Sequence, residues 1–216
     1  MLNRLQGWFK DARISKLKHQ LTNDEYEYLF DSVEDTFVCF DCETTGLNPR
    51  TDKVITLSAI KIVGRQIQTS ESLNLVIEQH QDISSESIEV HHIRNLDVEQ
   101  SQIRYQNEWK AMQAFLHFIK GATLVGYYLD FDVAMVNQVI KPKIGIGLPN
   151  PRIEVSGMYH DYELNKYRNA CFEPNVDLNF DHILEKLQIP NLGQHDAFND
   201  ALMTALIFVK LKELQT

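Results

Sequence analysis

Two carboxylates at the end of an apolar run are the first residues of this chain that could do chemistry. Residues 37–49 read FVCFDCETTGLNP, which places Asp41 and Glu43 directly after four apolar residues. Side chains on a strand alternate between its faces, so these two carboxylates point the same way, about 7 Å apart. Their negative charges repel each other unless a cation lies between them. The spacing therefore predicts half of a metal site at a strand end.

The pair alone leaves another interpretation open, because Asp, Thr and Gly are also common in ordinary turns. Further carboxylates follow at two other places in the chain. Asp130 and Asp132 lie where an apolar run meets a helical pattern. Asp200 lies one turn inside a helix that follows His195. Because α/β folds place their sites where strands end and helices begin on one edge of the sheet, these residues are expected to meet the first pair.

The elements that must position these side chains follow from the hydrophobic pattern. Runs of β-branched and aromatic residues predict strands, and apolar residues three and four positions apart predict helices. The predicted strands are 37–41, 54–63, 73–78, 122–128 and 152–155, with a hairpin turn at Gly64-Arg65. The predicted helices are 109–119, 131–140, 159–167, one capped by Asp177 that ends at Leu187, and one capped by Asp196 that ends near Leu214. Three hairpin-connected strands followed by α/β units predict an α/β fold with a mixed sheet.

The composition predicts one main globular domain. With 216 residues, of which 44% are hydrophobic, the chain can bury one sizeable core. The net charge of −9 argues against a protein that grips long duplexes, whereas a site that holds a few nucleotides through metal ions is compatible with it. Without a long apolar run or a secretory signal, the chain is expected to be cytoplasmic, with no membrane partner. Cys39, Cys42 and Cys171 lack CxxC spacing and are expected to be reduced thiols.

The first 35 residues are predicted to form a helical appendage, which leaves residues 36–216 as the main domain. Basic residues dominate the first part of this appendage and acidic residues the second. Its apolar positions, among them Trp8, Phe9 and Leu17, have helical spacing. This spacing favours packing against the main domain, and binding to a partner or to a membrane surface is the alternative.

Three short motifs contain the candidate residues: Asp-Cys-Glu-Thr-Thr-Gly at 41–46, Phe-Asp at 131–132 and His-x4-Asp at 195–200. In this order, and with these elements around them, they resemble the DnaQ-like 3′-to-5′ exonucleases of the DEDDh class. That family includes the proofreading subunit of the bacterial replicative polymerase. The resemblance covers roughly residues 36–212. It implies an RNase H-like mixed β-sheet flanked by helices on both faces.

The resemblance implies hydrolysis of phosphodiester bonds with two divalent ions, Mg²⁺ or Mn²⁺, about 3.5–4 Å apart. Hard divalent ions prefer oxygen ligands, which four carboxylates provide. By resemblance, Asp41 would contact both ions, Glu43 and Asp200 would bind the ion that carries the attacking water, and Asp132 would bind the second ion. His195 would then act as the general base, since an imidazole can take a proton near neutral pH.

The implied substrate is the single-stranded or frayed 3′ end of DNA, favoured over RNA, and the implied partner is a DNA polymerase or a repair protein. Candidate substrate contacts are Thr44, Thr45, Gly46, Leu47, His91 and Phe131. Members of the family often have His-Asn before the second motif, where this chain has Tyr127-Tyr128, so the substrate preference does not carry over directly. Asp130 is expected to cap the helix that follows it instead of binding metal.

Two other functions stay open at this point. The scattered pair of His91 or His92 with His195-Asp196 is also typical of all-helical HD-type metal-dependent phosphohydrolases, although the strand patterns argue against that class. A non-catalytic nucleic-acid-binding module of the same fold is the other alternative. The chain has all four carboxylates and His195, so its sequence gives no sign of a dead site.

Overall fold

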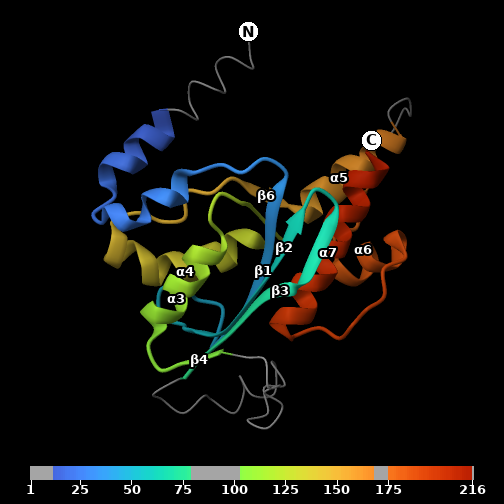
Figure 1. The fold of residues 1–216 in the computed structure, drawn as a ribbon. Helices are drawn as coiled ribbons and strands as arrows, with labels where there is room; N and C mark the ends of the chain where they lie inside the picture. The colour runs from blue at the N-terminus through green and yellow to red at the C-terminus, as the bar shows by residue number, and fades with distance from the viewer. Residues whose placement is uncertain (1–11, 79–102, 168–174, 216) are drawn as a thin grey trace.

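The computed structural model describes residues 12–78, 103–167 and 175–215, and a mixed sheet of six strands lies at its centre (Figure 1). The strand order is β4-β3-β2-β1-β5-β6. β2 is antiparallel to both β1 and β3, and the other neighbours are parallel. The strands are β1 (Thr36–Thr44), β2 (Val54–Val63), β3 (Gln66–Ile77), β4 (Ile103–Tyr105), β5 (Thr123–Gly126) and β6 (Arg152–Glu154). Because β1 and β5 are parallel neighbours, their carboxyl ends reach the same edge of the sheet.

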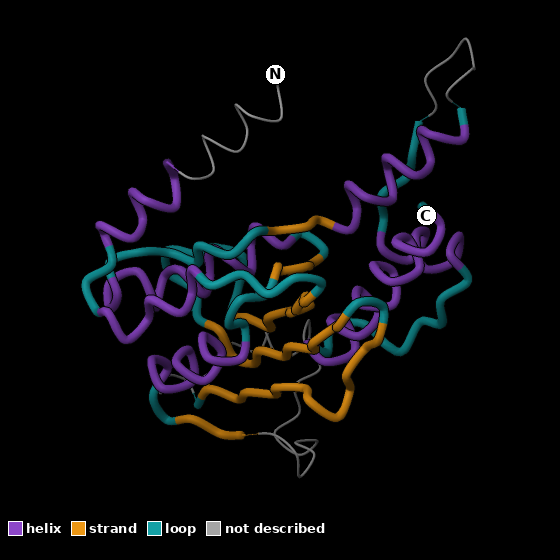
Figure 2. The backbone as a smooth tube through the Cα atoms, turned by 45° about the horizontal axis from the view of Figure 1, so that its top comes forward, coloured by secondary structure: helices purple, strands orange, loops and turns teal. Residues whose placement is uncertain are grey.

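Helices cover both faces of the sheet, which confirms the predicted RNase H-like architecture (Figures 1 and 2). One face packs against α3 and α4, and the other packs against α5, α6 and α7. Val38 and Phe40 of β1 belong to the first core and Cys39 to the second, and all three side chains are at most 2% exposed. A run that is buried on both faces must be apolar throughout, which explains the sequence FVCF. The helices are α3 (Glu108–Phe118), α4 (Leu129–Ile144), α5 (Val155–Lys166), α6 (Phe180–Leu187) and α7 (Ala197–Leu214).

Several elements extend beyond their predicted bounds or were not predicted, among them β1, which continues to Thr44, and α5, which begins at Val155. β3 begins at Gln66, because its polar first half pairs with β2 on the far side of the hairpin turn. β4 adds a three-residue strand beside β3, which is too short to show a hydrophobic period. α4 continues through Pro142, which lacks the N–H that would bond to the Gln138 carbonyl, and the helix is followed by Gly145 in a left-handed conformation.

The predicted helix caps are right for α7 and wrong for α6. Asp196 accepts a hydrogen bond from the backbone N–H of Asn199 at 2.9 Å, so it caps α7 as predicted. The cap of α6 is Asn179, whose side chain accepts from the N–H of Asp181 at 3.0 Å. Asp177 instead accepts from the N–H of Asn179 at 2.9 Å and closes the turn before the cap.

The described part of the N-terminal segment packs on the core beside α3. Residues 12–20 are helical, and a 3₁₀ helix η1 (Asp24–Phe30) follows. Tyr26 and Leu29 of η1 are 3% and 2% exposed in the same core as α3 and α4. The Tyr26 hydroxyl accepts a hydrogen bond from Gln113 at 2.8 Å. Trp8 and Phe9 lie outside the described residues, and the division at residue 36 stays a prediction.

Two further predictions concern thiols and membranes. Cys39 and Cys42 are free and buried, while Cys171 lies outside the described residues. None of the described helices combines the length and the apolar character needed to cross a bilayer.

Candidate active site

The predicted catalytic side chains meet in one cavity of about 300 Å³ at the carboxyl edge of β1. Three parts of the chain place them there: the end of β1, the first turn of α4 and the start of α7. The cavity is lined by Asp41, Cys42, Glu43, Leu47, Tyr127, Tyr128, Phe131, Asp132, Phe180, Gln194, His195, Asp200 and Thr204. The prediction that the three motifs converge at one sheet edge is therefore reproduced by the geometry.

Three of the four carboxylates form a compact group. One oxygen each from Asp41, Glu43 and Asp200 can be chosen so that all lie within 4.8 Å of one another. Glu43 is only 6% exposed, so its charge is poorly solvated. Such close carboxylates at a cavity wall are favourable when a cation bridges them, and oxygen ligands suit Mg²⁺ or Mn²⁺.

The fourth carboxylate, Asp132, is fixed against β1 from the facing helix. It lies in the first turn of α4 and is 3% exposed. Its Oδ1 accepts a hydrogen bond from the backbone N–H of Cys42 at 3.2 Å. Because this bond reaches the residue between Asp41 and Glu43, it holds α4 in place relative to the other acidic side chains.

Asp130 does not cap α4, contrary to the prediction. Its side chain is 94% exposed and forms an ion pair with Arg152 at 3.1 Å. The carboxylate of Glu154 takes the capping role, because it accepts hydrogen bonds from the N–H groups of Tyr128 and Leu129 at 3.2 and 3.0 Å. Asp130 is already the second residue of the helix, so its side chain lies past the first free N–H groups.

A hydrogen bond links the side chain of Asp200 to the backbone of His195. Asp200 Oδ2 accepts a hydrogen bond from the N–H of His195 at 3.0 Å. This bond holds His195 in a left-handed conformation with φ 65° just before the cap of α7. A histidine seldom adopts this conformation without such support, and the result is an exposed imidazole at the cavity wall.

The electrostatics of the group favour a bound cation. Burial raises the pKa of Asp41 well above its ordinary value, and the charges of Asp132, Asp200 and Glu43 raise it further. Burial also raises the pKa of Glu43 to about 7 and that of Asp132 to about 8. The pKa of Asp200 rises to about 6, mainly through burial and against the hydrogen bond from His195. Each shift means that the ionised form needs a compensating positive charge.

These pKa values predict how the metal-free protein responds to pH. Carboxyl groups with raised pKa values bind more protons in the folded than in the unfolded state, so the free energy of unfolding falls as pH rises through about 6 to 8. We expect the melting temperature in chelator to fall from pH 5 to pH 8, and Mg²⁺ to remove most of this fall. Asp132→Asn should flatten the chelator curve, whereas the control Asp130→Asn should keep it. A melting temperature that rises over this range would contradict the prediction.

The predicted substrate residues divide into three groups. Leu47 and Phe131 line the cavity. Thr44, Thr45 and Gly46 are not among its lining residues, and their role in substrate binding stays a prediction. The Thr45 N–H already donates to the Lys53 carbonyl at 2.9 Å, and a Cβ on Gly46 would lie 2.7 Å from Asp52 Oδ2, so this glycine is needed within the turn itself. His91 lies outside the described residues.

Several residues of the site were not predicted from the sequence. They are Tyr127, Tyr128, Glu154, Phe180, Gln194 and Thr204. Among these residues, the sequence drew attention only to Tyr127 and Tyr128, because they replace the His-Asn of the family pattern. Glu154 ends β6, a parallel neighbour of β5, so only the pairing of these two strands brings it to the start of α4.

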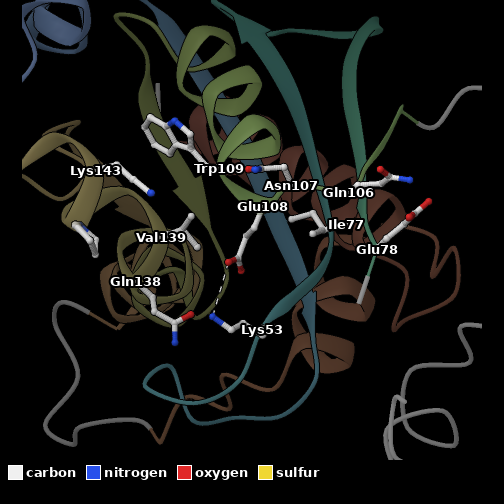
Figure 3. Close-up of a pocket in the computed structure, with 11 residues that line it drawn as sticks. Lys53, Ile77, Glu78, Gln106, Asn107, Glu108, Trp109, Gln138, Val139 and Lys143 are labelled. Carbon is white, nitrogen blue, oxygen red and sulfur yellow. Dashed lines mark ion pairs between the residues drawn. The ribbon is translucent and has the colours of Figure 1, made fainter. Parts of the chain in front are cut away.

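A second cavity, of about 640 Å³, is lined by Lys53 and by residues of β3, α3 and α4 (Figure 3). Lys53 and Glu108 face each other there in an ion pair at 3.7 Å. Gln138 and Lys143 of α4 contribute to the wall. None of the described residues that line it belongs to the predicted catalytic set, which separates this cavity from the carboxylate site.

Comparison with known proteins agrees with this geometry. A family model described as exonuclease (RNase_T) matches residues 38–208. A DNA polymerase III PolC-type of Thermotoga petrophila is 27% identical over 201 residues, which cover 93% of this chain but 13% of the relative. A PolC-type polymerase of Staphylococcus aureus is 27% identical and matches 82% of this chain and 11% of the relative. The chain thus corresponds to a small part of these relatives.

Solved structures share the fold. An E. coli ExoI–ssDNA complex matches with a TM-score of 0.66 and 17% identity over 85% of this chain and 41% of that chain. Cell-death related nuclease 4 (CRN-4) matches with a TM-score of 0.61 and 16% identity over 83% of this chain and 64% of that chain. With the family model spanning all three motifs, the chain belongs to the DnaQ-like family of 3′-to-5′ exonucleases.

Proposed function

We propose that this protein is a metal-dependent exonuclease that releases nucleoside 5′-monophosphates from single-stranded 3′ ends of DNA. The observation that carries the proposal is the convergence of Asp41, Glu43, Asp132, Asp200 and His195 in one cavity. The names of the PolC-type polymerases and the single-stranded DNA in the E. coli ExoI complex support DNA as the substrate. The PolC-type names support a DNA polymerase as a partner.

The carboxylates are proposed to hold two Mg²⁺ or Mn²⁺ ions. Asp41, Glu43 and Asp200 fit one ion, since their oxygens already lie within 4.8 Å of one another. Asp132 is proposed to serve the other ion together with Asp41. When bound, the ions supply water activation, neutralisation of the nonbridging oxygens and stabilisation of the leaving 3′ oxygen.

His195 is proposed to accept the proton of the attacking water. Its backbone is fixed by Asp200, while its imidazole remains exposed at the cavity wall. A base must lie within hydrogen-bond reach of the proton that it removes, and the place of His195 on the wall of the carboxylate cavity supports this role. The scissile bond then breaks toward the 3′ oxygen of the preceding nucleotide, which leaves the phosphate on the released nucleotide.

Replacing this base gives a separate prediction. His195→Asn should slow turnover by roughly 10²- to 10⁴-fold, because asparagine tolerates positive φ but cannot act as a base. Mn²⁺ binding, measured by titration of the metal-free protein, should stay close to that of the wild type. Wild-type rates at every pH would show that His195 is not the base.

The two alternative functions make different predictions about the fold. An HD-type phosphohydrolase is all-helical, and the six-stranded sheet shows that this alternative is wrong. A non-catalytic module of the same fold would bind an oligonucleotide without shortening it. The family and the complete set of acidic residues favour turnover.

A competition experiment tests the proposed substrate. We expect the protein with Mg²⁺ to shorten a single-stranded DNA faster than an RNA of the same sequence and faster than a blunt duplex. Equal or faster shortening of the RNA would overturn the preference for DNA. Binding of all three without shortening would favour the non-catalytic module.

A further inference from the structure

Tyr128 has a backbone conformation that bulky residues rarely adopt. Its φ of 56° and ψ of 33° lie in the left-handed region, directly before the first residue of α4. Four non-glycine residues of the described chain have positive φ, and two of them, Tyr128 and His195, line the carboxylate cavity. Strained residues of this kind persist when their surroundings hold them, and they gather at binding and catalytic sites.

Glu154 is the residue that holds Tyr128 in place. Its Oε1 and Oε2 accept hydrogen bonds from the N–H groups of Tyr128 and Leu129 at 3.2 and 3.0 Å. The Ser156 hydroxyl donates to Glu154 Oε1 at 2.9 Å and fixes the carboxylate in turn. The end of β6 therefore clamps the backbone at the start of α4.

The clamped backbone presents an exposed aromatic ring. Tyr128 is 69% exposed, which is unusual for a tyrosine on a rigid segment. The neighbouring ring of Tyr127 lies 4.5 Å from it, centroid to centroid. Tyr127 is in turn fixed by its hydroxyl, which donates to the Leu178 carbonyl at 2.9 Å, and by the Phe180 ring at 4.7 Å. Three aromatic rings thus form one supported group at the cavity rim.

This group lies beside the catalytic carboxylates. Tyr127, Tyr128 and Phe180 line the same cavity as the catalytic carboxylates. Leu47, which is 83% exposed, lines it as well. An exposed, preorganised ring beside a nuclease site matches the flat face of a nucleobase, because bases stack on aromatic side chains irrespective of sequence.

We propose that Tyr128, held by Glu154 and supported by Tyr127, is a stacking platform for an unpaired base near the scissile 3′ end. The proposal rests on the proposed exonuclease function and adds the feature of the substrate that is recognised. A paired base already stacks within its duplex, so the platform favours single-stranded or frayed ends. Tyr128 acts as the binding residue and Glu154 as a positioning residue.

Steady-state kinetics on single-stranded DNA test the platform. Tyr128→Ala should raise KM for single-stranded DNA about tenfold, equivalent to about 1.4 kcal/mol, with little change in kcat. Tyr128→Phe should restore the wild-type KM, because stacking needs the ring and not the hydroxyl. Tyr167→Ala is a matched control, since Tyr167 is also exposed at 43% but lies at the end of α5 and does not line the cavity.

Abasic sites identify the base that stacks. Two abasic strands are compared with the intact strand, one without the terminal base and one without the second base from the 3′ end. The wild type should bind one of these two strands more weakly than the intact strand. The same strand should show no such loss with Tyr128→Ala. Glu154→Ala should raise KM like Tyr128→Ala, and the double variant should add little to either. An unchanged KM in Tyr128→Ala, or an equal abasic penalty in variant and wild type, would overturn the platform.

Binding without turnover separates this proposal from the proposed function. Anisotropy of a labelled oligonucleotide with Ca²⁺ in place of Mg²⁺ reports binding alone. If Tyr128→Ala weakens binding about tenfold while the wild type never shortens the strand with Mg²⁺ or Mn²⁺, the platform stands and the exonuclease function fails. Equal binding by both proteins would overturn the platform even if the wild type is an active exonuclease.

Discussion

Asp41→Asn is expected to reduce metal-dependent hydrolysis by on the order of 10³-fold or more. Asp41 belongs to the compact acidic group, and its pKa is raised by burial and by four neighbouring carboxylates. Asparagine keeps the shape but removes the charge that holds the ions. Bound metal ions contribute several kcal/mol of transition-state stabilisation, and each 1.36 kcal/mol is a factor of ten in rate. Single-turnover rates on a labelled single strand measure the loss.

Asp41→Asn should not destabilise the fold. Removing a charge from a repulsive group favours the metal-free folded state, so Asp41→Asn should melt no lower than wild type in chelator at pH 8. Added Mg²⁺ should raise the melting temperature of the wild type but not of the variant. A large loss of stability with Mg²⁺ binding retained would mean that Asp41 is structural.

The second large expected effect is a difference between substitutions at Asp132 and at Asp130, which lie two residues apart. Asp132→Asn is expected to remove nearly all turnover, while the melting temperature in chelator at pH 5, where the Asp132 carboxyl with its pKa of about 8 is neutral, changes little. Asparagine keeps an Oδ1 that can accept the Cys42 N–H, whereas alanine would leave this buried donor unpaired at about 1–3 kcal/mol. Single-turnover rates on the labelled strand and a thermal melt measure the two quantities.

Asp130→Asn is the matched control for that experiment. Its exposed ion pair with Arg152 contributes at most about 1 kcal/mol, and its side chain does not line the cavity. We expect activity and stability close to those of the wild type. If Asp130→Asn lost turnover and Asp132→Asn kept it, the second metal ligand would be Asp130.

The features of the fold and of the site that the sequence predicts well are those that depend on residues close together in the chain. Alternation on a buried strand brings Asp41 and Glu43 to one face, and the cap at Asp196 places Asp200 one turn inside its helix. The order of motifs then predicts the family, because each motif ends a strand or begins a helix.

The parts that sequence does not predict depend on contacts between distant segments. Glu154 caps α4 only because β6 pairs with β5, and nothing near Asp130 in the sequence reveals a competitor for that role. Tyr26 and Leu29 are buried beside α3 although their segment is rich in acidic residues. In both cases long-range packing decides between local alternatives of similar energy.

The most direct test of the proposed exonuclease is the direction and metal dependence of strand shortening. The substrate is a 5′-labelled single-stranded DNA with a free 3′ hydroxyl, and the control is the same strand with a blocked 3′ end. With Mg²⁺ or Mn²⁺ we expect a ladder that shortens one nucleotide at a time from the 3′ end, with nucleoside 5′-monophosphates released. We expect no shortening of the blocked strand and none in excess chelator. Degradation that persists in chelator, or early release of the 5′ label as a mononucleotide, would contradict the proposed function.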